Sequence, residues 1–224
     1  MTYFLVDLRT PGVDVRPLRH VTGEIDFNEV FLDQVRVPDA HRVGEPGDGW
    51  RVANATLSGE RQMVSGSGSG GVDRIGGSGA ARVIRRAQEL GRHRDPHVRQ
   101  RLAAAHSEER IRDWTNQRVR AGLKAGRSPG PESSVGKVHQ GALNQRIQLL
   151  ATDLLGADAL AWPAGSSYAE ALPFEVKGML RSRANTIEGG TTEVNRNVIG
   201  ERVLGLPREP DPFDGAPWKD VPRS

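Results

Sequence analysis

Residues 183–208 read RANTIEGGTTEVNRNVIGERVLGLPR, and this stretch decides the fold class. It opens with a glycine turn, Glu188-Gly189-Gly190, whose backbone can approach a flat or anionic ligand because glycine carries no side chain. Thr191 or Thr192 can cap the helix that follows. Apolar residues at helical spacing predict that one face of this helix is buried: Val194, Val198, Ile199 and Val203. Gly205 and Pro207 then end it.

Helical patterns fill most of the chain before this motif. The first runs from about Gly47 and carries apolar residues at Trp50, Ala53, Leu57 and Val64. The segment SGSGSGG at 65–71 interrupts it, and a second helical segment spans 72–91. Asp95 and Pro96 are a helix start signal, with the aspartate as N-cap and the proline at the first helical position.

The helix after Pro96 is expected to run to about Gly126. Its apolar positions are Val98, Leu102, Ala105, Ile111, Trp114 and Val119. A further helix has spacings of four, three and four between Leu143, Ile147, Leu150 and Leu154. A short helix over 169–183 leads to the glycine turn. Helices joined by short turns predict a helical bundle.

The first forty residues carry β-strand patterns instead. Residues 3–8, YFLVDL, are predicted to form a buried strand, and 10–18 a turn and an edge strand. Phe31, Val35 and Val37 alternate as in a strand, with a turn or bulge at Asp33-Gln34. Such a sheet is too small to stand alone. The expected fold class is therefore mainly α with a small β part.

Composition excludes several kinds of protein. The mean hydropathy is −0.52, and no run of about 18 apolar residues could span a membrane. A net charge of +3 with 5% aromatic residues argues against a nucleic-acid-binding surface. The absence of cysteine excludes disulfides and is consistent with the cytoplasm, where we expect the protein. The histidines show no spacing typical of a metal site, so no metal is expected.

The opening motif closely resembles the end of the acyl-CoA dehydrogenases, flavoenzymes that desaturate acyl-CoA thioesters. The segment FNEVFLDQVRVPDAHRVGEPGDGW at 27–50 resembles the part of that family that joins its middle β-domain to its C-terminal helical domain. The resemblance implies a remnant of the β-domain over 1–45, a helical-bundle domain over 46–206 and an irregular proline-rich tail over 207–224. It also implies FAD as cofactor.

Desaturation of a thioester needs a carboxylate base in a partly dry pocket. By pattern alone, Glu60 lies on the apolar face of its helix, three residues after Leu57 and four before Val64. There it is either functional or paired with an arginine at the polar edge of the helix, and the pattern favours the pair. LSGERQMVSG at 57–66 resembles the helix that carries the catalytic glutamate in one branch of the family, which favours Glu60 as the base.

The resemblance assigns the remaining site residues. In the family's other branch the catalytic glutamate immediately precedes the final glycine-threonine of the turn. This chain has Gly189 at that position, and Glu188 lies one residue before it. Arg61, Glu188 and Gly189 are expected on the substrate side, and Gly190, Thr191 and Glu193 on the flavin side. Alternative roles remain: a surface ion pair for Arg61, and helix capping for Thr191 and Glu193.

Family members also carry an N-terminal helical domain and the first half of the β-domain, which have no counterpart in this sequence. We therefore expect a homo-oligomer or a partner subunit that supplies this half, with acyl-CoA as substrate and electron-transferring flavoprotein as acceptor. The alternative is a non-catalytic subunit or truncated remnant of a heteromeric acyl-CoA dehydrogenase. A relative that reacts with oxygen is a third possibility.

Overall fold

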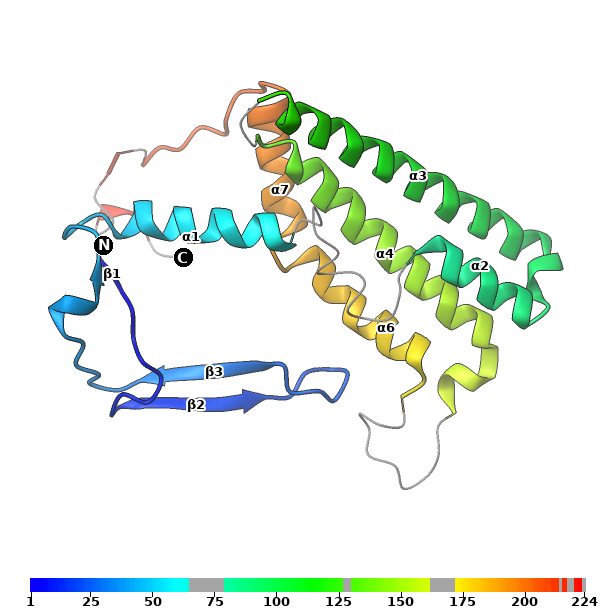
Figure 1. Ribbon diagram of the computed structural model, residues 1–224, viewed down its shortest axis with the longest axis horizontal. Coiled ribbons are helices and arrows are strands. Elements are labelled where there is room, and N and C mark those ends of the chain that lie inside the picture. Colours follow the sequence, from blue (N-terminus) through cyan, green and yellow to red (C-terminus); the bar gives the residue numbers. More distant parts are fainter. Residues whose placement is uncertain (65–78, 127–129, 162–171, 214, 217–219, 223–224) are drawn as a thin grey trace.

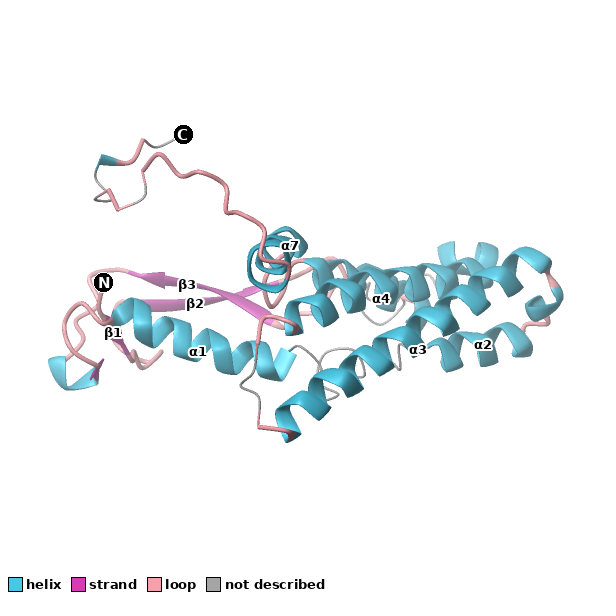
Figure 2. Ribbon diagram, turned by 90° about the horizontal axis from the view of Figure 1, so that it is seen from above, coloured by secondary structure: helices cyan, strands magenta, loops and turns pink. Residues whose placement is uncertain are grey.

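In the computed structural model the chain divides into a helical body and a smaller β part, which lie side by side (Figure 1). The structure describes residues 1–64, 79–126, 130–161, 172–213, 215–216 and 220–222, and of residues 58–64 it describes the backbone only. The helices of the body are α2 (Ala80–Glu89), α3 (Pro96–Lys124), α4 (Ser133–Leu155), α6 (Phe174–Ser182) and α7 (Thr192–Val198). Helix α1 (Gly49–Val64) begins beside β1 in the β part and extends toward the helical body (Figures 1 and 2).

Helix α4 is the centre of the helical body. It packs against α2 and α3 on one side and against α6, α7 and the 3-10 helix η5 (Arg183–Thr186) on the other. Its predicted apolar residues, Leu143, Ile147, Leu150 and Leu154, are at most 3% exposed, which confirms the spacing argument. The main core joins them to residues of α2 and α3: Ala80, Val83, Ala87, Leu102 and Ala105.

Capping residues fix two helix starts, as the sequence predicted. The Asp95 carboxylate accepts from the backbone N–H groups of His97 and Val98 at the start of α3. Of the two threonines, Thr191 is the cap of α7, and its hydroxyl accepts from the Val194 N–H at 3.2 Å. Helix α7 continues as a π-helical turn, η6 (Ile199–Val203), before Gly205. The other 3-10 segments are η1 (Asp39–His41), η3 (Arg92–Arg94) and η4 (Gly156–Leu160).

The β part consists of two antiparallel strand pairs. Strand β1 (Tyr3–Phe4) pairs with β4 (Arg42–Val43), and β2 (Val13–Leu18) pairs with β3 (Phe27–Leu32). The prediction of a buried strand over 3–8 is wrong: the strand has two residues, and Leu5 and Leu8 are 62% and 58% exposed. The strand predicted around Val35 and Val37 ends at Leu32 instead, because the chain turns at Asp33-Gln34, where Gln34 has a φ of +48°.

Apolar faces of three helices are less buried than their periodicity predicts. Trp50 of α1, Trp114 of α3 and Val194 of α7 are 64%, 57% and 54% exposed. Among the described residues these side chains have too few neighbours to be buried, although the Arg110 guanidinium lies 5.5 Å from the centre of the Trp114 ring. The predicted helix over 72–91 begins at Ala80 in the described region, and the interruption at 65–71 lies outside it. The helix predicted over 169–183 spans Phe174–Ser182, and residues 169–171 lie outside the described residues.

The loop between β2 and β3 docks onto helix α6. Glu24, at the tip of this hairpin, forms an ion pair with Lys177 of α6. Thr22 beside it is fully buried, and its hydroxyl contacts both His20 and Glu24. The hydrogen bond from Lys177 lowers the pKa of Glu24 below its ordinary value. This contact therefore links the β part to the helical body.

None of the described helices is both long and apolar enough to cross a lipid bilayer.

We predict that Ile147→Ala lowers the free energy of unfolding by about 2–5 kcal/mol, because it leaves a cavity in the centre of the core. Ile147 is 1% exposed. Ile111→Ala on α3 is the matched control: Ile111 is 50% exposed, and the same change there should stay within about 0.5 kcal/mol. Urea denaturation measures both variants. Equal losses would contradict the position of α4 at the centre of the body.

The Glu24–Lys177 pair predicts a pH dependence of stability. Because the folded state lowers the pKa of Glu24, its contribution is present above the ordinary carboxyl pKa and is lost as pH falls through the lowered value. The pair is partly exposed, so its contribution is below about 1 kcal/mol. Lys177→Met should remove this part of the acid-induced loss, measured as unfolding free energy between neutral and acidic pH. Lys124→Met on α3 is the control, and an unchanged pH profile in Lys177→Met would refute the assignment.

Candidate functional site

The glycine turn lies at the surface of the helical body, between η5 and α7. Gly189 and Gly190 have φ values of +63° and +92°, a backbone region that residues with side chains rarely adopt. Ile187 just before them is 65% exposed. A Cβ atom on Gly190 would lie 3.0 Å from the side-chain nitrogen of Asn195. The turn thus presents bare backbone outward while a side chain backs it from inside.

Asn195 of α7 holds the C-terminal side of this turn. Its side-chain N–H₂ group donates to the carbonyl oxygens of both Gly190 and Thr191, each at 2.9 Å. Asn195 is only 8% exposed. The sequence motif contained this residue without indicating its role, which is to bind the turn back onto the helix that follows it.

Glu188 forms the N-terminal side of the turn. Its carboxylate accepts one hydrogen bond from the Asn185 side chain at 2.8 Å and another from Arg181 at 3.0 Å. Its backbone N–H donates to the Ala184 carbonyl oxygen at 2.9 Å. Both carboxylate oxygens therefore have partners within the described chain, and the side chain is held against η5 and α6.

A row of polar side chains on α4 lies behind Asn185. The Asn144 side chain donates to the Asn185 side-chain oxygen at 2.6 Å, and Gln148 donates to Asn144 at 3.3 Å. Lys137 donates to the Asn185 backbone carbonyl. Burial lowers the pKa of Lys137, while the nearby charge of Glu188 acts in the opposite direction. These polar groups sit on a helix whose other face forms the core.

The other predicted site residues are placed as follows. Glu60 and Arg61 belong to the C-terminal third of α1, and their side chains lie outside the described residues. Thr191 caps α7, and Glu193 is exposed in its first turn. The structure therefore brings together Glu188, Gly189, Gly190 and Thr191, while the positions of Glu60 and Arg61 relative to them stay a prediction.

A buried charge lies between α6 and α2. Glu175 of α6 is 8% exposed, and its carboxylate lies 3.3 Å from Arg86 and 3.9 Å from Arg82, both on α2. Burial lowers the pKa of Arg82, and the attraction of Glu175 opposes this effect. The group joins α2 directly to α6, which is a structural role.

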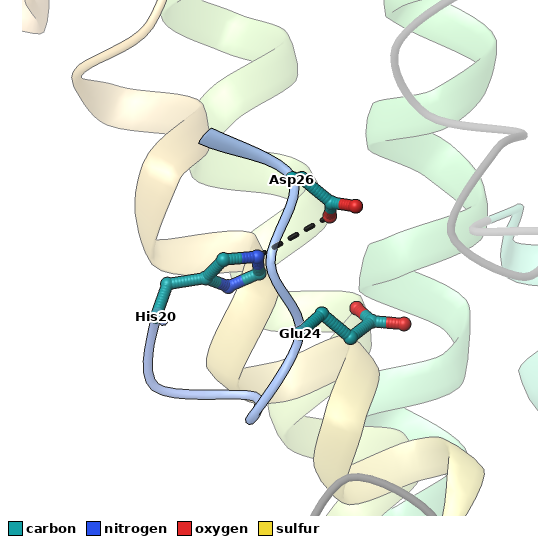
Figure 3. Close-up of side chains that lie close together, drawn as sticks. All are labelled: His20, Glu24 and Asp26. Atoms are coloured by element: carbon teal, nitrogen blue, oxygen red, sulfur yellow. Dashed lines mark hydrogen bonds and ion pairs between the residues drawn. The ribbon is translucent and has the colours of Figure 1, made fainter. Parts of the chain in front are cut away.

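One cluster of potential metal ligands occurs among the described residues. His20, Glu24 and Asp26 at the hairpin tip have ligand atoms within 4.8 Å of one another (Figure 3). The His20 ring lies 3.2 Å from the Asp26 carboxylate. However, Glu24 is already bound by Lys177 and Thr22, so the cluster is explained by the docking of the hairpin onto α6.

Sequence reasoning missed the polar groups behind the turn. A signal was present: Asn144 and Gln148 lie four residues apart on α4 and are interleaved with its apolar residues. Polar side chains on a buried helix face need partners, so such a pair predicts a polar contact with a neighbouring element. The pattern does not say which element that is.

Comparison with known proteins agrees with this architecture. The model of the acyl-CoA dehydrogenase C-terminal domain matches residues 47–204. The acyl-CoA dehydrogenase IpdE1 of Mycobacterium tuberculosis is 36% identical over 222 residues, which are 93% of this chain and 51% of that protein. The chain thus spans about half the length of the curated relatives it matches first.

Solved structures show the same fold. The Tcur3481-Tcur3483 steroid acyl-CoA dehydrogenase superposes with a TM-score of 0.76 at 24% identity, covering 93% of this chain and 52% of that one. The ChsE4-ChsE5 complex from Mycobacterium tuberculosis gives a TM-score of 0.67 at 25% identity, with coverage of 93% and 54%. With a helical bundle centred on α4, the glycine turn before α7 and a family model that matches most of its length, this chain belongs to the acyl-CoA dehydrogenase family and corresponds to its C-terminal portion.

Proposed function

We propose that this chain supplies the C-terminal half of an FAD-dependent enzyme that desaturates an acyl-CoA thioester between its α and β carbons. The observation that carries this proposal is the glycine turn: two consecutive glycines with positive φ, of which Gly189 is half-buried and Gly190 exposed, with hydrogen-bonded side chains on both flanks. A flat ring can approach such a backbone closely because no Cβ atom stands in the way. The residues present thus fit a flavin on the Gly190–Thr191 side of the turn.

In this proposal the two glutamates have different tasks. FAD, when bound, supplies the acceptor for the β-hydride. Glu60 removes the α-proton, because a carboxylate on the apolar face of α1 is poorly solvated once the pocket is assembled. Glu188 is held by Asn185 and Arg181, which supports its role in shaping the substrate side of the turn together with Gly189. Arg61, next to the base, contacts substrate.

The β part supports a second element of the proposal, a partner that completes the pocket. Among the described residues each strand of the β2–β3 hairpin has one partner, so both outer edges are unpaired. Val15 and Val30, which are opposite each other in its register, are 37% and 48% exposed. A two-stranded hairpin with an apolar face needs further strands to be stable. We infer that these strands come from an N-terminal half, carried by the same polypeptide or by a partner subunit.

Two related structures carry names that join two components, which is consistent with a partner subunit. In the alternative version of the proposal, this chain is a non-catalytic subunit of such a heteromer. The acceptor in our proposal is an electron-transferring flavoprotein in the cytoplasm. Reduced enzyme that reoxidises rapidly in air without this acceptor would instead indicate the oxygen-reactive kind of relative.

We predict that Glu60→Gln lowers the desaturation rate of the assembled protein by about 10²–10⁴-fold, the usual contribution of a general base, while FAD remains bound. The measurement is the anaerobic bleaching of the flavin band by acyl-CoA. Glu89→Gln on α2 removes an exposed carboxylate of the same type and serves as the control. An unchanged bleaching rate in Glu60→Gln would exclude it as the base, and a wild-type protein that binds FAD without bleaching by any acyl-CoA tested would favour the non-catalytic subunit.

Gly190→Ala tests the contact between the turn and the flavin. The new Cβ meets the Asn195 side chain at 3.0 Å and is strained at a φ of +92°, so we expect the FAD dissociation constant to rise at least about tenfold, or roughly 1.4 kcal/mol. Gly47→Ala is a matched control, because Gly47 has a φ of +95° but no atom within 4 Å of the new Cβ. Fluorescence titration with FAD measures both. Equal FAD affinity in the two variants would place the flavin elsewhere.

A further inference from the structure

A continuous chain of hydrogen-bonded polar side chains, three of them buried, runs from helix α4 to the glycine turn. It begins at Gln148, passes through Asn144 and Asn185, and ends at the Glu188 carboxylate. The first three residues are 2%, 7% and 8% exposed. Buried amide groups are costly unless they are paired, so the three amide side chains favour the arrangement in which they are hydrogen-bonded. The last member is the residue immediately before the two glycines.

The backbones of α4 and η5 approach each other closely at Gly141. A Cβ atom on Gly141 would lie 2.8 Å from the Asn185 backbone oxygen, so only glycine lets the two backbones approach this far. Lys137, one turn earlier on α4, donates to the same oxygen. Gln145 donates to the Ser182 carbonyl and to the Thr186 hydroxyl, each at 3.3 Å. Helix α4 therefore binds the segment before the turn at several successive positions.

We propose that the chain Gln148–Asn144–Asn185–Glu188 positions the glycine turn, with Asn185 as the central positioning residue. Its hydrogen bonds attach the turn to the core helix and so restrict the backbone of two glycines that have no intrinsic preference for one conformation. The consequence for FAD and thioester binding rests on the function proposed above, whereas the positioning of the turn does not. None of the four residues in this chain is assigned to the chemical step.

The geometry allows a test in which donor and acceptor are exchanged. Asn185→Asp keeps the acceptor for Asn144 but replaces the donor to Glu188 by a second carboxylate, so the two carboxylates repel each other. Adding Glu188→Gln restores a hydrogen bond in the opposite direction, because the new amide donates to the new carboxylate. Its carbonyl oxygen still accepts from Arg181, and the double variant has the charge of the wild type.

The measurement is amide hydrogen exchange over residues 187–191 in the full chain. We expect Asn185→Asp to accelerate exchange there at least about tenfold, the effect of losing one hydrogen bond to a charged group. The double variant should recover to within about threefold of the wild-type exchange rate, a tolerance that allows for the different strength of the reversed bond. Gln140→Glu on α4 is the control, because it adds one negative charge, as Asn185→Asp does. The Gln140 side-chain oxygen accepts a hydrogen bond from Arg112 of α3 at 2.6 Å, and the carboxylate of a glutamate can accept the same bond. This control should leave exchange over 187–191 unchanged.

Two results would overturn the proposal: exchange over 187–191 that is unaffected in Asn185→Asp, or a double variant that does not recover. If circular dichroism shows that Asn185→Asp is unfolded, Arg181→Gln replaces it, because it loosens the same carboxylate from a partly exposed position. Exchange over 187–191 should then rise, and no rise would likewise overturn the proposal.

FAD binding by the assembled protein separates this proposal from the proposed function. A weaker FAD affinity in Asn185→Asp that recovers in the double variant supports both. If the wild-type protein binds no FAD but the variants show the expected exchange rates over 187–191, the flavin function is refuted and the positioning role stands. If the wild-type protein binds FAD but the variants do not show these exchange rates, the positioning role is refuted and the flavin function stands.

Discussion

The close contact between α4 and the segment 182–188 is the constraint on which the rest of the structure depends. One face of α4 forms the apolar core with α2 and α3. Its other face approaches η5 closely, because Gly141 leaves room for the Asn185 backbone oxygen. On the α6 side, Gln148 occupies the space that a side chain on Gly178 would need. A single helix therefore fixes both the packing of the body and the path of the chain into the glycine turn.

Polar and charged groups accompany this contact. Unpaired, such groups would destabilise the fold, but here Asn144 donates to Asn185 of η5, and the Glu175 carboxylate forms ion pairs with Arg86 and Arg82 of α2. Apolar packing supplies the driving force for folding, and the polar pairs select one register between the helices. Because polar pairs fix the register while apolar packing drives folding, a segment with an exposed turn can be held in one conformation next to a well-packed core.

Much of the helical body could be predicted from the sequence, because long helices leave strong periodic signals. The spacing of Leu143, Ile147, Leu150 and Leu154 located the core face of α4, and the Asp95-Pro96 signal located the start of α3. The β part was less predictable. Whether a short apolar run such as 3–8 is buried depends on strands that pair with it, and local sequence contains no information about them.

Part of the candidate site could likewise be predicted from the sequence, and part could not. The glycine turn and its threonine cap follow local rules of backbone geometry, so the motif alone indicated them. Asn144, Asn185 and Lys137 act through contacts between residues some 40 to 50 positions apart in the chain, and no pattern in a single sequence specifies such pairs. Exposure of Trp114 and Val194 was also unpredictable, because periodicity identifies an apolar face but not whether anything covers it.

The visible absorption spectrum tests the central claim, that the glycine turn forms half of a flavin site, most directly. The chain would be mixed with FAD and with the N-terminal half that completes the β-domain, desalted and measured. The account predicts a retained flavin band with about one FAD per completed pocket, and a weaker band for the chain alone, because half a pocket offers too few contacts to hold the cofactor. A colourless protein after assembly with a folded N-terminal half would contradict the account.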